Sequence, residues 1–156
     1  MGAHLIDFAY WALDLGYPTT VETVSTPFDQ ACFPMATTTY YEFPARGVLP
    51  PVRLTWYDGG IMPATPPEIG EDQLNRDGGA LLIGSKGKLL HDNYGLRSRL
   101  LPASLEKTVG EPPRTLARIT TSHELNWADA CKGVGEATTP FEYAAKLTEV
   151  MLLGVV

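Results

Sequence analysis

The sequence predicts an α+β domain with a mostly antiparallel, open-faced sheet and helices packed on one face of that sheet. Three observations lead to this class. The apolar patterns run in the order helix, several strands, then two helices, without the alternation that a doubly wound parallel sheet requires. The 15 glycines and 13 prolines among 156 residues indicate many turns. A hydrophobic content of 44% with 19% charged residues is typical of a chain that builds a packed core.

Charge and cysteine content exclude several classes of protein. The formal net charge of -6 argues against nucleic-acid binding, because neutralising phosphates requires a basic face. Two cysteines, Cys32 and Cys131, are too few for a disulfide framework, and we expect each to be a small apolar filler or a loop thiol. No apolar run approaches the roughly 20 residues that span a bilayer. The sequence therefore predicts neither a nucleic-acid partner nor a membrane partner.

The first predicted helix begins at the start of the chain. Its inner stripe follows helical spacing and consists of Leu5, Phe8, Ala9, Ala12 and Leu13. Gly16 is expected to be the residue that ends this helix, since Pro18 prevents continuation. No N-cap precedes the helix, and the apolar residues 150–156 lack a stop signal. We therefore expect residues 1–156 to be a single domain that is truncated at both ends.

Runs rich in β-branched and aromatic residues predict the strands. These strands are expected at residues 21–26, 35–43, 52–57, 80–83, 88–91 and 99–101. The segment Gly84-Ser85-Lys86-Gly87 predicts a hairpin turn. Residues 61–77 and 102–114, which contain prolines, are expected to be irregular connections.

Two further helices are predicted from their capping sequences. Thr121-Ser122-His123-Glu124 fits a capping box, and Gly133 is expected to end that helix. Thr139-Pro140-Phe141-Glu142 fits a second capping box with proline at the first helical position. The inner stripe of the last helix is expected to be Ala144, Leu147, Val150, Met151 and Gly154.

The polar side of the first helix carries the main candidate for chemistry. His4, Asp7, Trp11 and Asp14 follow one another at steps of three, four and three residues. A histidine beside a carboxylate on one helix face suits an oriented general base or a pair of metal ligands. A solvated or inter-helix polar face has the same pattern. The spacing thus leaves open a general base, a small metal site at His4 and Asp7, and a polar face that is solvated or packed against another helix.

Other familiar patterns fail on inspection. Residues 78–86 place Ser85 where a phosphate-binding loop needs lysine, and no G-x-G-x-x-G is present. Trp127 stands where a zinc-binding H-E-x-x-H would require its second histidine. His91, next to Asp92, is expected in a surface hairpin. The aromatic residues on successive strands either line a sugar-binding face or pack against helices; they are Tyr40, Tyr41, Trp56 and Tyr57.

Taken together, these motifs resemble one family. Gly2-Ala3-His4-Leu5-Ile6-Asp7, followed by Trp11-Ala12-Leu13, resembles the G-x-H-x-x-D…W-x-L helix of the glucose-fructose oxidoreductase, inositol dehydrogenase and rhizopine catabolism (Gfo/Idh/MocA) oxidoreductases. Further stretches are similar to the bacterial branch of that family, in the same order along the chain. They are residues 56–60, 84–90, 122–133 and 147–154.

The resemblance implies the C-terminal substrate-binding and oligomerisation domain of an NAD(P)-dependent sugar or polyol oxidoreductase. It implies that His4 is catalytic and exchanges a proton with the substrate hydroxyl. Asp7, Trp11, Trp56 and Tyr57 are the candidate substrate-binding residues. It also implies a homo-oligomer formed through the open sheet face.

The same resemblance places NAD or NADP in a full-length parent protein and no cofactor or metal in this chain. The nucleotide fingerprint, the E-K-P segment with the family's lysine, and an aspartate four residues before His4 are all absent. We therefore expect the isolated chain to be inactive. The alternative is a non-catalytic binding or assembly module with the same fold.

Overall fold

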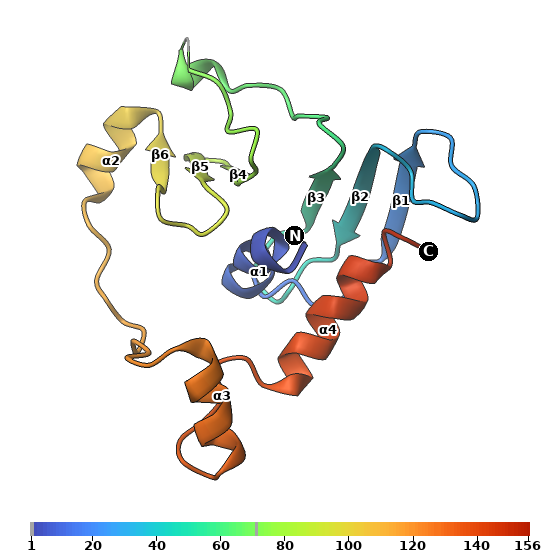
Figure 1. The fold of residues 1–156 in the computed structure, drawn as a ribbon. Helices are drawn as coiled ribbons and strands as arrows, with labels where there is room; N and C mark the ends of the chain where they lie inside the picture. Colours follow the sequence, from blue (N-terminus) through green and yellow to red (C-terminus); the bar gives the residue numbers. More distant parts are fainter. Residues whose placement is uncertain (1, 71) are drawn as a thin grey trace.

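A computed structural model describes residues 2–70 and 72–156 and confirms the α+β class (Figure 1). The helices are α1 (Gly2–Ala12), α2 (Ala103–Val109), α3 (His123–Cys131) and α4 (Phe141–Leu152), with a 3₁₀ turn, η1, at Pro67–Ile69. The strands are β1 (Thr20–Ser25), β2 (Thr37–Phe43), β3 (Val52–Tyr57), β4 (Ala80–Gly84), β5 (Gly87–His91) and β6 (Arg99–Leu101). Every predicted strand is present to within about two residues.

The strands form two three-stranded antiparallel sheets, where the sequence suggested one. Their orders are β1-β2-β3 and β4-β5-β6. Gly84 pairs with Gly87, so the predicted hairpin turn between β4 and β5 is confirmed. The proline-containing residues 61–77 carry the chain from β3 to β4, and their described part, 61–70 and 72–77, contains no strand; this long connection separates the two sheets.

The core lies between the first sheet and the helices α1 and α4. Side chains alternate along a strand, so Tyr41 and Phe43 of β2 point to one face. On that face they pack against Leu147 and Val150 of α4. The other buried apolar members of this core are Ile6, Tyr10 and Leu15. Leu147 and Val150 confirm the predicted inner stripe of the last helix.

The opposite, uncovered face of the first sheet is polar and aromatic. Glu42 and Arg53 pair across β2 and β3, with 2.5 Å between Oε1 and Nε, and both side chains are solvent-accessible. Tyr40 and Tyr57 lie on this same face by strand alternation. An open face is therefore present, and it carries charged and aromatic side chains.

The end of α1 corrects the prediction for Gly16. Asp14, with φ of 48°, is the left-handed residue that terminates the helix. The amide of Leu15 donates to the Tyr10 carbonyl at 3.1 Å, and that of Asp14 donates to the Trp11 carbonyl at 3.3 Å. This pair of bonds is a Schellman motif, and the buried side chains of Leu15 and Tyr10 supply its hydrophobic contact.

The predicted inner stripe of α1 is also wrong in part. Ile6 and Tyr10 are the buried residues of this helix, whereas Phe8 is 36% exposed. Phe8 turns toward the second sheet, where its ring contacts His91 of β5. The reason is that α1 lies between two partners, with the core on one side and the second sheet on the other (Figure 1). A single-stripe pattern assumes one partner only.

Helix α2 was expected to be an irregular connection. Pro102 stands at its N-cap, where the missing N–H costs no helical hydrogen bond. Gly110, with φ of 66°, ends the helix after two turns. The Glu106 carboxylate accepts a bond of 2.9 Å from the Leu100 amide, which joins α2 to β6. Pro102 therefore marks the start of a short helix, and not only an interruption of regular structure.

The caps of the last two helices differ by one residue from the prediction. Ser122, not Thr121, caps α3, with its Oγ accepting from the Leu125 amide at 3.3 Å. Helix α4 begins at Phe141 with Pro140 at the N-cap and no side-chain capping bond, so Thr139 does not cap it. Among the described residues, no helix is both long enough and apolar enough to cross a membrane.

Candidate functional site

Two aromatic pairs join α1 to the second sheet. The His4 ring meets the Tyr94 ring edge-on, with 6.1 Å between centroids and 63° between planes. One helical turn later, Phe8 meets His91 in the same manner, at 4.7 Å and 61°. Residues four apart share one helix face, so both pairs form along a single line of α1. His4 itself is exposed on this outer face.

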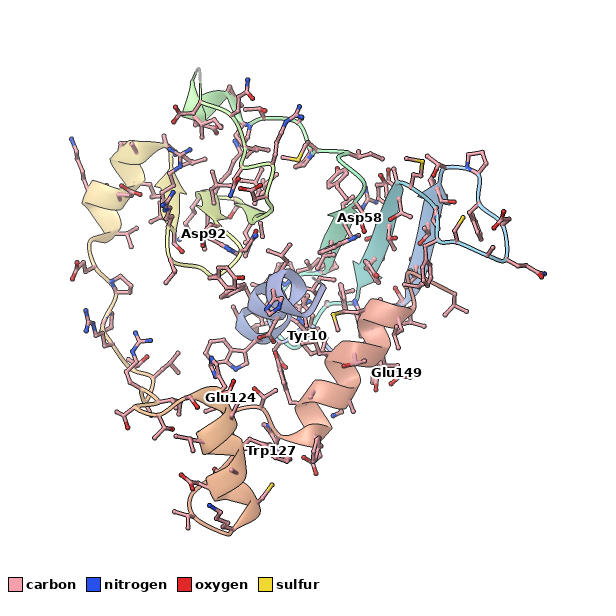
Figure 2. The ribbon with its side chains drawn as sticks, in the orientation of Figure 1. Tyr10, Asp58, Asp92, Glu124, Trp127 and Glu149 are labelled. Carbon is pink, nitrogen blue, oxygen red and sulfur yellow. The ribbon has the colours of Figure 1, made fainter. Side chains whose placement is uncertain are left out.

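The segment that receives α1 is the turn after β5, residues 91–96. Figure 2 shows Asp92 in this turn. Its Oδ1 accepts hydrogen bonds from the amides of Tyr94 at 3.1 Å and Leu96 at 2.9 Å. Burial alone would raise the pKa of Asp92, but these backbone hydrogen bonds and nearby Arg97 outweigh it and lower the pKa. The bonds fix the backbone that carries Tyr94.

Gly95 lets the turn approach Phe8 closely. Its φ is 69°, a conformation that favours glycine, and a Cβ there would stand 3.1 Å from Cε1 of Phe8. The aromatic ring of Phe8 therefore rests on the glycine backbone. Asx-type bonding by Asp92 and a glycine three residues later is a turn signal that the sequence itself carries.

His91 is buried, which corrects the expected surface position. Its side chain is only 5% exposed. Nδ1 lies 2.7 Å from the Asp92 carbonyl oxygen, which can only accept, so the hydrogen is assigned to Nδ1. Among the residues that the structure describes, Nε2 has no hydrogen-bond partner.

Asp7 points to α4 instead of pairing with His4. Its Oδ1 accepts a hydrogen bond from the hydroxyl of Tyr143, and the pair is partly buried. Burial, then this hydrogen bond, then the Asp7 charge raise the pKa of Tyr143. Within residues 2–70 and 72–156, no hydrogen bond or ion pair joins His4 to Asp7. The residues predicted to share the polar side of α1 therefore face two different neighbours. His4 contacts Tyr94 in the turn after β5, and Asp7 bonds to Tyr143 of α4.

The remaining candidate residues lie in separate places. Trp11 is 57% exposed on α1, and Asp14 lies beyond the end of the helix. Trp56 pairs with Thr39 on the helix-covered face of the first sheet and packs against the core. Tyr57 follows it and points to the opposite face. Trp56 and Tyr57 therefore cannot line one surface, and Trp56 has a packing role.

A second polar group lies between α1 and α4, where Figure 2 labels Tyr10 and Glu149. Tyr17 donates from its hydroxyl to Oε2 of Glu149 at 2.7 Å. Burial and then the charges of Asp14 and Glu149 raise the pKa of Tyr10. The Tyr17–Glu149 bond joins the connection after α1 to α4.

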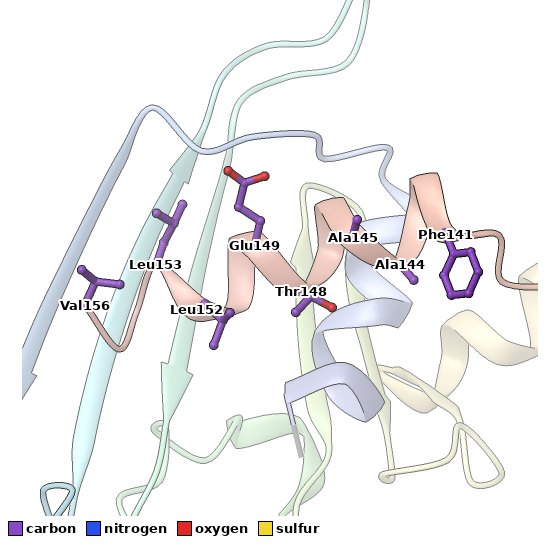
Figure 3. Close-up of a pocket in the computed structure, with 8 residues that line it drawn as sticks. All are labelled: Phe141, Ala144, Ala145, Thr148, Glu149, Leu152, Leu153 and Val156. Atoms are coloured by element: carbon purple, nitrogen blue, oxygen red, sulfur yellow. The ribbon is translucent and has the colours of Figure 1, made fainter.

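The outer side of α4 carries a shallow apolar groove (Figure 3). Its lining side chains are Phe141, Ala144, Ala145, Thr148, Glu149, Leu152, Leu153 and Val156. They recur at helical spacing on the side away from the core. The described part of the chain contains no group of three His, Cys, Asp or Glu side chains that could hold a metal ion.

The fold and the site together define an α+β domain in which one exposed histidine is presented on the first helix beside an exposed tyrosine. No family model matches the sequence, and no curated protein is significantly similar to it. The residues that sequence reasoning missed are Tyr94, Asp92 and Tyr143, which lie far along the chain from α1; Tyr143 is 136 positions from its partner Asp7.

Proposed function

We propose that this chain is the substrate-binding and assembly domain of an NAD(P)-dependent sugar or polyol oxidoreductase. The observation that carries the proposal is the exposed imidazole of His4 beside the exposed ring of Tyr94. Resemblance of the helix Gly2-Ala3-His4-Leu5-Ile6-Asp7 to the Gfo/Idh/MocA pattern supports the assignment of His4. It is a proposal about reaction type and leaves the particular sugar open.

In this proposal His4 acts as the general base. An alcohol carbon gives up hydride more readily as its hydroxyl proton is removed, and an imidazole is suited to take that proton near neutral pH. Tyr94, which is 67% exposed, offers an aromatic face for the C–H side of a sugar ring. Asp7 acts indirectly here, because its carboxylate holds α1 to α4 through Tyr143.

The nicotinamide cofactor belongs to the parent protein in this proposal. The chain has no G-x-G-x-x-G sequence, and so its own residues do not fit the nucleotide. We accordingly expect the isolated chain to bind a polyol weakly without oxidising it.

The binding step can be tested by NMR on the chain itself. Titration with myo-inositol and D-glucose should shift the resonances of His4 and Tyr94 before those of other side chains. His4→Ala should weaken the response without unfolding the domain, since the His4 side chain is exposed. Trp127→Ala, a change at an exposed aromatic residue on α3, is the matched control. Shifts confined to regions remote from residues 4 and 94 would refute the proposed site.

The alternative is a non-catalytic binding or assembly module, and the extent of the exposed surface points to self-association. The accessible surface is 11699 Å². A compact monomer of 17.0 kDa would expose about 7,700 Å². A stable interface needs about 800 Å² per partner, and the excess is several times larger. Self-association is compatible with both functions.

We propose that the chain forms a homo-oligomer through the open face of the first sheet. The groove on α4 is the competing surface, because Leu152 is 56% exposed there. Light scattering after size-exclusion chromatography should show an oligomer. Val24→Lys, on the open face, should dissociate it, and Leu152→Lys should leave it intact. The reverse pattern would assign assembly to α4, and a wild-type monomer would refute assembly altogether.

A further inference from the structure

Among the described residues, Tyr94 makes the aromatic contact with His4. The two ring centroids lie 6.1 Å apart, and the ring planes meet at 63°. No hydrogen bond in the described part of the chain involves the His4 imidazole. A histidine on an exposed helix face samples several side-chain rotamers when nothing holds it. What orients the imidazole must therefore come from this aromatic neighbour.

Tyr94 is itself held in place by its backbone. Oδ1 of Asp92 accepts from the amides of Tyr94 and Leu96, and the Gly95 amide donates to the Asp92 carbonyl at 3.2 Å. Ser98 adds a hydroxyl bond of 3.0 Å to the Gly95 carbonyl. Hydrogen bonds therefore hold the backbone on both sides of Tyr94, and the position from which its side chain extends is fixed.

The pair Phe8 and His91 sets the position of the helix relative to the turn. The two rings are only 4.7 Å apart, and His91 is buried. Gly95 leaves the space that the Phe8 ring occupies. Because Phe8 and His4 are one helical turn apart, this contact brings His4 to the level of Tyr94.

We propose that Tyr94 is a positioning residue that orients the His4 imidazole, with the Asp92 turn as its support. An edge-on aromatic pair favours its own geometry over alternatives by roughly two- to twelve-fold. The consequence for catalysis rests on the proposed function of His4, but the orientation itself does not. Tyr94 keeps an exposed surface while doing so, which leaves room for a ligand beside both rings.

The orientation can be measured without any activity. The ring current of Tyr94 should displace the His4 imidazole proton resonances in an NMR spectrum of the wild-type chain. Tyr94→Phe should preserve this displacement, because the ring remains, and Tyr94→Ala should abolish it. Tyr40→Ala, a change at an exposed tyrosine on β2, is the matched control and should have no effect on His4. An unchanged His4 spectrum in Tyr94→Ala would overturn the proposal.

A second pair of variants tests the support. Asp92→Asn keeps an acceptor for the amides and should retain most of the displacement, whereas Asp92→Ala should reduce it. Resonances of Phe8 and His91 report whether α1 remains docked. If the ring-current effect is present but no polyol shifts His4, the proposed function fails and the positioning role stands. If polyols bind and Tyr94→Ala leaves the His4 spectrum unchanged, the positioning role fails alone.

Discussion

The hydrogen bond between Tyr143 and Asp7 is a direct test of how α1 is held. Tyr143→Phe removes the hydroxyl and leaves the ring, which packs against Tyr10 with 5.9 Å between centroids. A hydrogen bond to an ionised acceptor contributes about 1.5–3 kcal/mol, and the partial exposure of this pair reduces that contribution. We therefore expect the free energy of unfolding to fall by about 1–2 kcal/mol.

Thermal or urea unfolding followed by circular dichroism measures this loss. For a domain of this size, a change of 1–2 kcal/mol corresponds to a shift in Tm of about 2–8 °C. Tyr17→Phe is the matched control, since it removes a similar hydroxyl bond to Glu149 from a more exposed pair. Its effect should be smaller than that of Tyr143→Phe.

A double-mutant cycle assigns the effect to the contact itself. Asp7→Asn, Tyr143→Phe and the combined variant should give a coupling energy of about 1 kcal/mol. A coupling near zero would mean that the loss comes from packing, and our reasoning about Asp7 would be wrong. A coupling of the expected size with unchanged polyol binding in Asp7→Asn would show that Asp7 stabilises the helix pair instead of binding substrate.

Three further predictions concern backbone and pH. Asp14→Gly should stabilise the chain by about 0.5–1 kcal/mol, because glycine suits a positive φ and the change removes an acidic charge from a helix C-terminus; Asp14→Val should destabilise it in the same urea titration. Gly59→Ala should be far more destabilising than Gly60→Ala, since both have positive φ but only at Gly59 would a Cβ stand 2.1 Å from a backbone carbonyl oxygen; similar urea midpoints for the two variants would contradict this. Burial raises the pKa of Tyr41, and burial with hydrogen bonding raises that of Tyr143, above the unfolded value of 10.0. Their contribution to stability is therefore complete below about pH 10 and is lost above it, and urea titrations from pH 8 to about 11 should show a smaller loss in Tyr143→Phe than in the wild type.

The strands were predictable because their signal is local. Residues 37–43 carry three threonines and two tyrosines, and β-branched and aromatic side chains suit an extended chain wherever it lies. The turn at Gly84–Gly87 has the same local character. Likewise, the α3 and α4 start signals were correct to within one residue, since the capping groups lie next to the amides that they serve.

The candidate site was predictable only as far as His4. The sequence placed His4 and Asp7 on one helix, but it did not show that Tyr143 takes the Asp7 carboxylate or that Tyr94 faces His4. Both partners come from distant parts of the chain. Their pairing depends on how α4 and the turn after β5 dock on α1, which no local pattern encodes.

The sequence by itself determined the α+β class, the order of the six strands and of helices α1, α3 and α4, and the acidic net charge. It also predicted that no helix of the described residues would be long and apolar enough to cross a membrane. The tertiary structure alone decided that the strands separate into two sheets, that Phe8 turns outward to a buried His91, and that Asp14 ends α1. The physical reason is the same in each case. Local propensities act over one or two turns of chain, whereas these features depend on which surfaces meet after the elements have formed.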